Sequence, residues 1–176
     1  SYTANSLNQY SLINDGNAKI PSYDFDGNTT SDGTWTMTWD AEDRLVTAIK
    51  TNDTKLEFSY DYMSRRAEKK GYSWDTDHWS PTSNHRFVYD KYLQVEQLDA
   101  LNSNTIEKKN IWESGGKRLL STMSTSSTFY ALGDANKNIS EYLDASGDIQ
   151  AHYEFSPFGK GQSATGDKSG DFNYRF

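Results

Sequence analysis

The chain has 176 residues, with 25 acidic and 18 basic side chains, a net charge of −7 and no cysteine. This length allows one domain with a hydrophobic core, and the lack of cysteine excludes disulfides and cysteine-bound metals. The negative charge, without a basic patch, argues against nucleic acid as a partner. No apolar run approaches the ~20 residues of a membrane helix. We therefore expect no membrane insertion.

Aromatic residues form 14% of the chain although hydrophobic residues total only 34%. That balance is typical of thin antiparallel sheets with one wet face, in which large rings supply most of the burial. Along the chain, residues 1–22 indicate an entry strand, and Gly33 to Trp39 alternate large and small side chains. Trp35, Met37 and Trp39 should therefore share one covered face.

Further strands are predicted from period-two patterns and β-branched or aromatic residues. They cover Leu45 to Lys50, Lys55 to Tyr60, Arg86 to Tyr89, Gln94 to Leu98, Thr105 to Trp112 and Ile149 to Phe155. Two segments rich in Gly, Pro, Asp and Asn are predicted as long loops, 71–86 and 159–171. No helix is expected. The sequence thus predicts a single all-β domain over residues 1–176.

One short phrase recurs: an aromatic residue, an Asp, two variable residues and a turn-permissive residue. Four copies keep the aromatic, at Tyr23-Asp24, Trp39-Asp40, Tyr60-Asp61 and Tyr89-Asp90, and three keep only the acid, at Asp99, Asp134 and Asp144. The Asp side chain can accept a bond from a backbone N–H two residues on. Each copy is therefore predicted to form a hairpin tip, and the chain an antiparallel meander of hairpins.

Counted from the Asp, the fourth residue of the phrase should adopt a left-handed backbone conformation. Gly27, Asp43, Asn102 and Gly147 suit it, whereas Ser64, Leu93 and Lys137 depart from the preferred types. The residues predicted to build turns are Asp24, Gly27, Asp40, Asp61, Asp90, Asp134, Asp144 and Gly147.

This phrase resembles the YD repeat of RHS proteins, which include bacterial RHS toxins, subunits of insecticidal toxin complexes, and teneurins. The segments Tyr130 to Ile149, His152 to Gly159 and Asn173 to Phe176 are similar to the start of the RHS-associated core region. The resemblance implies a curled, shell-like sheet and a secreted or cell-surface bacterial protein. It also implies a polypeptide cargo or neighbouring repeats as partners.

Chemical sites are weakly indicated. Asp24, Asp26 and Asn28 superficially match a calcium loop, but Gly27 falls at its fourth position and no Glu follows in register, so a capped turn is preferred. The three histidines, His78, His85 and His152, belong to no catalytic motif. With 25 acids some carboxylate pair must fall in range by chance, so such pairs carry no weight. We expect no metal, no cofactor and no enzymatic activity.

Trp74 and Trp79 lie in the predicted 71–86 loop beside acidic residues. They either fold back as a plug over a sheet face or stack on a ligand such as a sugar ring, and the plug is preferred. The resulting hypothesis is a non-enzymatic piece of a β-shell that encloses or presents a polypeptide. The alternative is a surface module that recognises glycan or protein through aromatic loops. Unpaired strand edges near Tyr2, Tyr10 and Phe172 to Phe176 also predict either a homodimer through a terminal strand or a terminus folded back over an open edge.

Overall fold

The computed structural model describes residues 1–14, 16–116 and 118–174, and these residues form strands and turns with no helix. They divide into two compact units, and the single domain expected from the sequence stays a prediction. The first unit comprises Ser1–Arg86 with Asp99–Ser103, and the second comprises Phe87–Leu98 with the residues from Asn104 onward. Among the described residues, no helix offers the length and apolarity that a membrane crossing requires.

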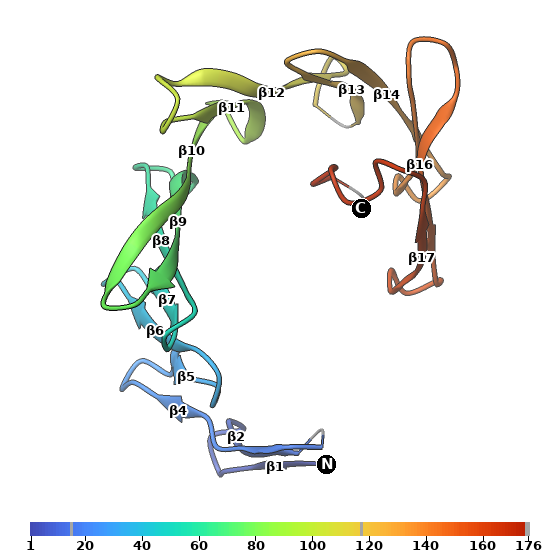
Figure 1. Cartoon of the computed structure of the whole chain (residues 1–176). Coiled ribbons are helices and arrows are strands. Elements are labelled where there is room, and N and C mark those ends of the chain that lie inside the picture. The colour runs from blue at the N-terminus through green and yellow to red at the C-terminus, as the bar shows by residue number, and fades with distance from the viewer. Residues whose placement is uncertain (15, 117, 175–176) are drawn as a thin grey trace. The chain divides into compact units, whose positions relative to one another are not determined.

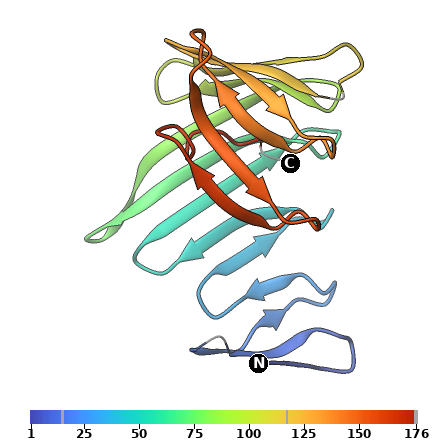
Figure 2. The ribbon, with the colours of Figure 1, turned by 90° about the vertical axis from the view of Figure 1, so that its right-hand side faces the viewer.

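The strands of the first unit follow one another closely (Figure 2). They are β1 (Tyr2–Ala4), β2 (Tyr10–Asn14), β3 (Ala18–Lys19), β4 (Ser22–Tyr23), β5 (Thr29–Ser31), β6 (Thr36–Trp39), β7 (Leu45–Lys50), β8 (Thr54–Tyr60), β9 (Arg66–Asp75) and β10 (His78–Asp90). Strands β1 to β3 form a small sheet of their own. Strand β10 begins in the first unit and ends in the second.

The second unit is built in the same way (Figure 1). Its further strands are β11 (Leu93–Asp99), β12 (Thr105–Trp112), β13 (Leu119–Ser124), β14 (Thr128–Gly133), β15 (Ile139–Leu143), β16 (Ile149–Phe155) and β17 (Gly161–Thr165). From β4 to β17 each strand is hydrogen-bonded to its neighbour in the chain, so the strand order is the chain order. The predicted all-β antiparallel meander is confirmed.

The predicted loop over 71–86 is wrong, because these residues form most of a long hairpin between β9 and β10. Trp74 pairs with Trp79, and only Thr76 and Asp77 separate the two strands. Among the polar residues that indicated a loop, Asp75 is exposed at the end of β9 and Asp77 lies in the turn, and Pro81 is accommodated where the register shifts. The predicted loop over 159–171 is also interrupted, since β17 lies within it and pairs with β16.

Strand β6 shows the expected alternation. Met37 and Trp39 are half-buried, while Thr36 and Thr38 are exposed. The indole Nε1 of Trp39 donates to the carbonyl oxygen of Thr29 at 2.8 Å, so the ring both covers the sheet and satisfies its polar atom.

The second unit has a fully developed core. Buried side chains from β13 to β16 pack with Phe172, which comes from a segment we call the strap, residues 166–174. Tyr142 is completely buried at the centre of this cluster. The strap turns back beside the sheet (Figure 1), and Phe172 stacks on Tyr142 with ring centroids 3.8 Å apart.

The strap bears on the prediction for the chain's ends. Phe172 and Tyr174 fold back over the face of the sheet, where rings can be buried, and not over an open strand edge. Near the N-terminus, Tyr2 and Tyr10 contact each other across β1 and β2, with ring centroids 5.3 Å apart. Arg175 and Phe176 lie outside the described residues. A homodimer through strand edges stays a prediction.

Candidate functional site

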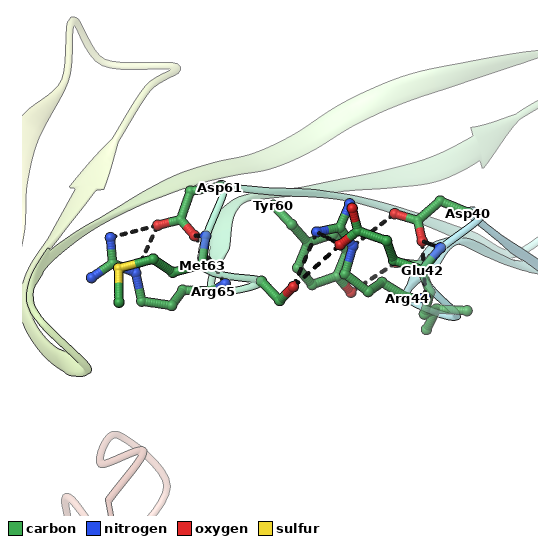
Figure 3. Close-up of polar contacts among 9 residues, drawn as sticks. Asp40, Glu42, Arg44, Tyr60, Asp61, Met63 and Arg65 are labelled. Carbon is green, nitrogen blue, oxygen red and sulfur yellow. Dashed lines mark hydrogen bonds and ion pairs between the residues drawn. The ribbon is translucent and has the colours of Figure 1, made fainter.

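The turn at Asp61 shows what the repeated phrase builds (Figure 3). The Asp61 carbonyl accepts the Ser64 N–H at 3.0 Å, and the Asp61 N–H donates to the Arg65 carbonyl at 2.9 Å. The carboxylate Oδ1 accepts the N–H groups of Met63 and Arg65 at 2.8 and 3.0 Å, while Oδ2 accepts Arg65 Nε at 2.7 Å. One carboxylate therefore ties together a five-residue turn.

Four other aspartates accept the same two backbone bonds through Oδ1 and add a side-chain bond through Oδ2. They are Asp24 (with Asn28), Asp40 (with Arg44), Asp134 (with Asn138) and Asp144 (with Gln150). A further turn begins at Ser156, whose hydroxyl accepts the Lys160 N–H at 3.1 Å. Sequence reasoning missed this turn because it has Ser in place of Asp, although Pro157 and Gly159 marked it.

The fourth residue of these turns has positive φ, as the phrase predicts. Ser64 (φ 58°) and Lys137 (φ 70°) adopt this conformation despite their side chains, just as Gly27 and Gly147 do. The turn bonds on both sides thus impose a conformation that the residue type alone disfavours.

The phrase at Asp90 departs from this pattern. Asp90 ends β10, and only Lys91, with φ 54°, and Tyr92 precede β11. Asp99 accepts the Leu101 N–H through its carboxylate, but the positive φ values fall at Ser103 and Asn104. The expectation for Asn102 was therefore wrong, because this loop is longer than its sequence match suggested.

Neighbouring turns of the first unit are joined side to side (Figure 3). Asn28 Nδ2 donates to Asp43 Oδ1 at 2.7 Å, linking the first turn to the second. Arg44 Nη1 lies 2.8 Å from Glu42 Oε2 and donates to Ser64 Oγ at 3.3 Å, linking the second to the third. Asn28 and Arg44 thus each close their own turn and also contact the next one.

Hydrogen bonds hold the pKa of four turn carboxyls below its ordinary value, those of Asp24, Asp40, Asp61 and Asp134. For Asp61 the largest cause is the side-chain bond from Arg65. At Asp40 desolvation raises the pKa, but the bonds from Arg44 and the turn backbone outweigh it. The pKa is lowered in the same direction at Asp24 and Asp134, where hydrogen bonds from the turn outweigh desolvation. These carboxylates are held in their charged form. Their assignment as structural groups stays a prediction.

The two candidate stacking residues contact each other across the β9–β10 hairpin. The rings of Trp74 and Trp79 meet edge to face, with centroids 4.9 Å apart, and Lys55 Nζ lies 5.9 Å from the Trp79 ring. Both side chains are half-buried. They come from paired strands and not from a loop, and their role in ligand stacking stays a prediction.

The histidines lie apart from one another. His78 contacts Asp77, and His85 pairs in register with Lys69 on β9. His152 lies between two carboxylates, with Nδ1 2.9 Å from Glu141 Oε1 and Nε2 3.6 Å from Glu154 Oε1. Over residues 1–14, 16–116 and 118–174, no group of three or more His, Asp or Glu is placed to hold a metal ion.

A cavity of about 300 Å³ lies beside the strap in the second unit. Its wall is mixed, including the rings of Phe129 and Tyr142 and polar groups such as those of Asn110 and Thr122. Lys108 also lines it, and desolvation lowers the pKa of this lysine. The Lys108 ammonium donates to the Asp171 carbonyl at 2.5 Å. Sequence reasoning did not single out this cavity, because its residues come from segments far apart in the chain.

The fold and the repeated turns define a class: antiparallel hairpin-meander proteins whose hairpin tips are tied by an aspartate. No family model matches the chain. The chain is 30% identical over 175 residues to the tRNA3(Ser)-specific nuclease WapA of Bacillus spizizenii, a match that covers 98% of the chain and 7% of that protein. It is 29% identical over 173 residues to the tRNA nuclease WapA of Bacillus subtilis strain 168, with the same coverages.

Solved structures with a similar fold belong to toxin complexes. The Photorhabdus luminescens Tc holotoxin pore matches all of this chain and 10% of its own, with a TM-score of 0.59 and 11% identity. The TcdB2-TccC3 crystal structure matches 88% of this chain and 8% of its own, with a TM-score of 0.58 and 13% identity. At these identities the likeness establishes the fold alone.

These comparisons correct two expectations. The similar proteins are named tRNA nucleases, which overturns the hypothesis of a purely non-enzymatic structural or recognition module and the expectation that the protein is not an enzyme. The exclusion of nucleic acid as a partner is likewise unsupported. Net charge misled here because the chain spans only 7% of the length of the two WapA proteins, so its charge says little about a whole protein of that kind.

Proposed function

We propose that this chain is part of a secreted or cell-surface RHS/YD-repeat protein that acts as a nuclease on tRNA. The similarity to WapA over 98% of the chain carries the proposal. The aspartate turns support the RHS/YD-repeat part of it, because Asp24, Asp40, Asp61, Asp134 and Asp144 each close the turn that the phrase describes. The fold shared with the toxin-complex structures also supports that part.

The test of the nuclease activity is direct. The polypeptide that carries this chain in its natural reading frame is purified and incubated with total bacterial tRNA, and new RNA ends are mapped by sequencing. We expect cleavage of a restricted set of tRNAs, with 5S ribosomal RNA left intact as the matched control. A folded, full-length protein that leaves every tRNA intact would refute the proposal.

A second arm locates the activity. The 176-residue chain is assayed alone beside the parent polypeptide. Cleavage by the chain alone would place the active residues within it, and His152 with Glu141 would be the first pair to replace, because a carboxylate can orient an imidazole for proton transfer. Cleavage only by the parent would place them elsewhere in the polypeptide.

Neighbouring repeats of the same polypeptide are the partners that this proposal implies. Strand β17 is the last strand in the sheet order and pairs with β16. A strand at the end of a sheet offers unpaired N–H and C=O groups to another strand. Hydrogen exchange at Gln162 to Thr165 should therefore be slower in the parent polypeptide than in the chain alone. Equal rates would show that no neighbour pairs there.

Location is tested separately. Intact cells that express the parent polypeptide are treated with protease, and the fragments are detected with an antibody against this chain. We expect digestion of cell-associated protein or recovery of the protein from the medium. Full protection within intact cells would contradict a secreted or surface location.

A further inference from the structure

The cavity beside the strap has the size and the walls of a site for a small molecule. Its volume of about 300 Å³ lies at the lower end of the range for ligand pockets in proteins. Asn110, Thr122 and Phe129 in its wall are buried, whereas Ser126 and Ser127, between β13 and β14, are exposed. The cavity therefore reaches from solvent to the core of the second unit, and the strap forms part of its wall.

Aromatic rings give the buried part of this wall a fixed shape. Phe172 stacks on Tyr142 and meets Phe129 edge to face, with centroids 3.8 and 5.1 Å apart. All three side chains are buried and closely packed, so they have little freedom to rearrange. Met123 adds an adaptable thioether to the lining. An apolar ligand body can thus be buried against a preformed surface, at little cost in ordering the protein.

Three charged side chains line the cavity, namely Lys108, Lys168 and Asp171. Two ammonium groups and one carboxylate leave a single positive charge, in a chain whose net charge is −7. Lys168 Nζ lies 3.5 Å from Asp171 Oδ2, so these two side chains largely offset each other. The positive charge that remains is therefore that of Lys108.

The Lys108 ammonium is only partly satisfied by the protein. Among the described residues, its hydrogen-bond partner is the Asp171 carbonyl oxygen at 2.5 Å, and it forms no ion pair, although an ammonium has three N–H donors. Desolvation lowers the pKa of Lys108, and the charges of Glu107 and Asp171 only partly oppose this. Glu107 follows the alternation of β12 to the opposite face, where it accepts from Gln97 Nε2 at 2.8 Å. An anion in the cavity would supply the charged acceptor that Lys108 lacks.

We infer that this cavity binds a small organic monoanion, a carboxylate whose oxygens accept from Lys108 Nζ and whose apolar body packs against Phe129 and Met123. Polar groups of the wall, such as the Thr122 hydroxyl, add hydrogen bonds to the ligand. A single negative charge matches the single positive charge of the wall, so a carboxylate is favoured over a doubly charged phosphate ester. This inference is independent of the nuclease proposal, because no part of it depends on RNA cleavage.

The probe is cinnamate, and cinnamyl alcohol is its uncharged control of nearly the same shape. Each is titrated into the isotope-labelled chain, and the amide signals are followed by NMR. For cinnamate we expect saturable shifts at Thr122, Phe129 and other lining residues, with a dissociation constant of about 1 mM or tighter for a ligand of this size. The alcohol should bind at least about tenfold more weakly, because it lacks the charge. Shifts that do not saturate, or that spread through the first unit, would overturn the inference.

Substitution at Lys108 tests the charge pairing. Lys108→Met keeps an unbranched side chain without the ammonium, so it should weaken cinnamate binding at least about tenfold and leave binding of the alcohol unchanged. Lys109→Met is the matched control, because Lys109 does not line the cavity and lies 3.7 Å from Glu96. It should bind cinnamate as the unsubstituted chain does. Equal affinity of the Lys108→Met and unsubstituted chains for cinnamate, or an alcohol that binds as tightly as cinnamate, would refute the site.

A second measurement uses the unsubstituted chain and covers the case in which Lys108→Met fails to fold. The chain is acetylated with a trace of acetic anhydride, and the rate at each lysine is read by mass spectrometry. Cinnamate at about ten times its dissociation constant should slow acetylation of Lys108 about tenfold, because the bound carboxylate covers the ammonium and favours its protonated form. Lys109 should react at an unchanged rate. An unchanged rate at Lys108, or equal slowing of both lysines, would contradict the inference.

Discussion

At the scale of single residues, one carboxylate accepts hydrogen bonds from backbone N–H groups of a tight turn that would otherwise bond to water. Asp61 accepts from two backbone N–H groups and pairs with both Arg65 Nε and Nη2, the latter at 2.6 Å. The neighbouring ring adds to this, since the Arg44 guanidinium carbon lies 5.0 Å from the centroid of the Tyr60 ring. Asp61 and Arg65 therefore act together within one turn, while Tyr60 of that phrase contacts Arg44 of the preceding one.

Replacing Asp61 by Ala should lower the melting temperature by a few degrees, because two backbone N–H groups lose their acceptor, as when a helix cap is removed. The melting temperature of Asp61→Asn should lie between those of the unsubstituted chain and Asp61→Ala, because Asn keeps one acceptor oxygen and loses the ion pair. Circular dichroism on heating measures both. Asp77→Ala is the matched control, because its side chain is 86% exposed and bonds to the adjacent His78. An Asp61→Ala chain as stable as the control would contradict a structural role.

Stability should fall at acid pH because the turn carboxyls have lowered pKa values in the folded chain. The unfolded carboxyls, with ordinary pKa near 3.9, take up protons first as pH falls, which favours unfolding. Urea denaturation should give a nearly constant free energy of unfolding from pH 7 to about pH 5 and a steep loss below about pH 4. Asp61→Asn should make that loss shallower. A loss already complete at pH 5 would point to other groups.

At the scale of elements, a turn residue with positive φ is favourable when it is glycine and costly otherwise. Lys137 and Gly147 occupy the same position in successive turns, with φ 70° and 88°. Lys137→Gly should raise the free energy of unfolding by about 0.5–1 kcal/mol. A left-handed residue with a side chain costs ~1–2 kcal/mol, and the larger conformational entropy that glycine loses on folding offsets part of the gain. The reverse change, Gly147→Lys, should lower it by a similar amount. Urea denaturation measures both, and changes of the same sign would show that side-chain contacts dominate.

Turns were predictable from sequence because their chemistry is local. Asp134 bonds only to residues within four positions of itself, so the phrase contained everything that the turn needs. The β9–β10 hairpin was not predictable, because the polar residues around Asp75 and Pro81 are typical of loops and their strands depend on pairing with each other. The strap was missed for a similar reason. Its glycines indicate a loop, and the ring of Phe172 is buried by residues distant in the chain, such as Tyr142, 30 residues before it, and Phe129.

At the scale of the whole molecule, the two units differ in how they are stabilised. Among the described residues, Ala48 is the buried hydrophobic residue of the first unit, which is a thin sheet, while the second unit has a core cluster of seven buried residues that includes Tyr142. Contacts between neighbouring turns therefore contribute more to the stability of the first unit, and packing of aromatic rings contributes more to that of the second.

Phe172→Ala should lower the free energy of unfolding by about 3–5 kcal/mol, the usual loss when a buried aromatic side chain is replaced by Ala. Hydrogen exchange should report the loss locally, with faster exchange at β14 to β16 and unchanged rates at β7 and β8. Tyr92→Ala is the control, because that ring is 74% exposed. Uniformly faster exchange along the chain would show that the units unfold together.

Because each strand from β4 to β17 pairs with its chain neighbours, the molecule has low contact order for an all-β protein. Each hairpin can form as soon as its second strand has been synthesised or has crossed a membrane, without waiting for distant sequence. The strap is the exception, since Lys108 meets Asp171 across 63 positions. Folding should thus proceed hairpin by hairpin from the N-terminal side, and until residues 166–174 follow, the rings of Phe129 and Tyr142 that Phe172 covers should remain exposed to other chains or to chaperones.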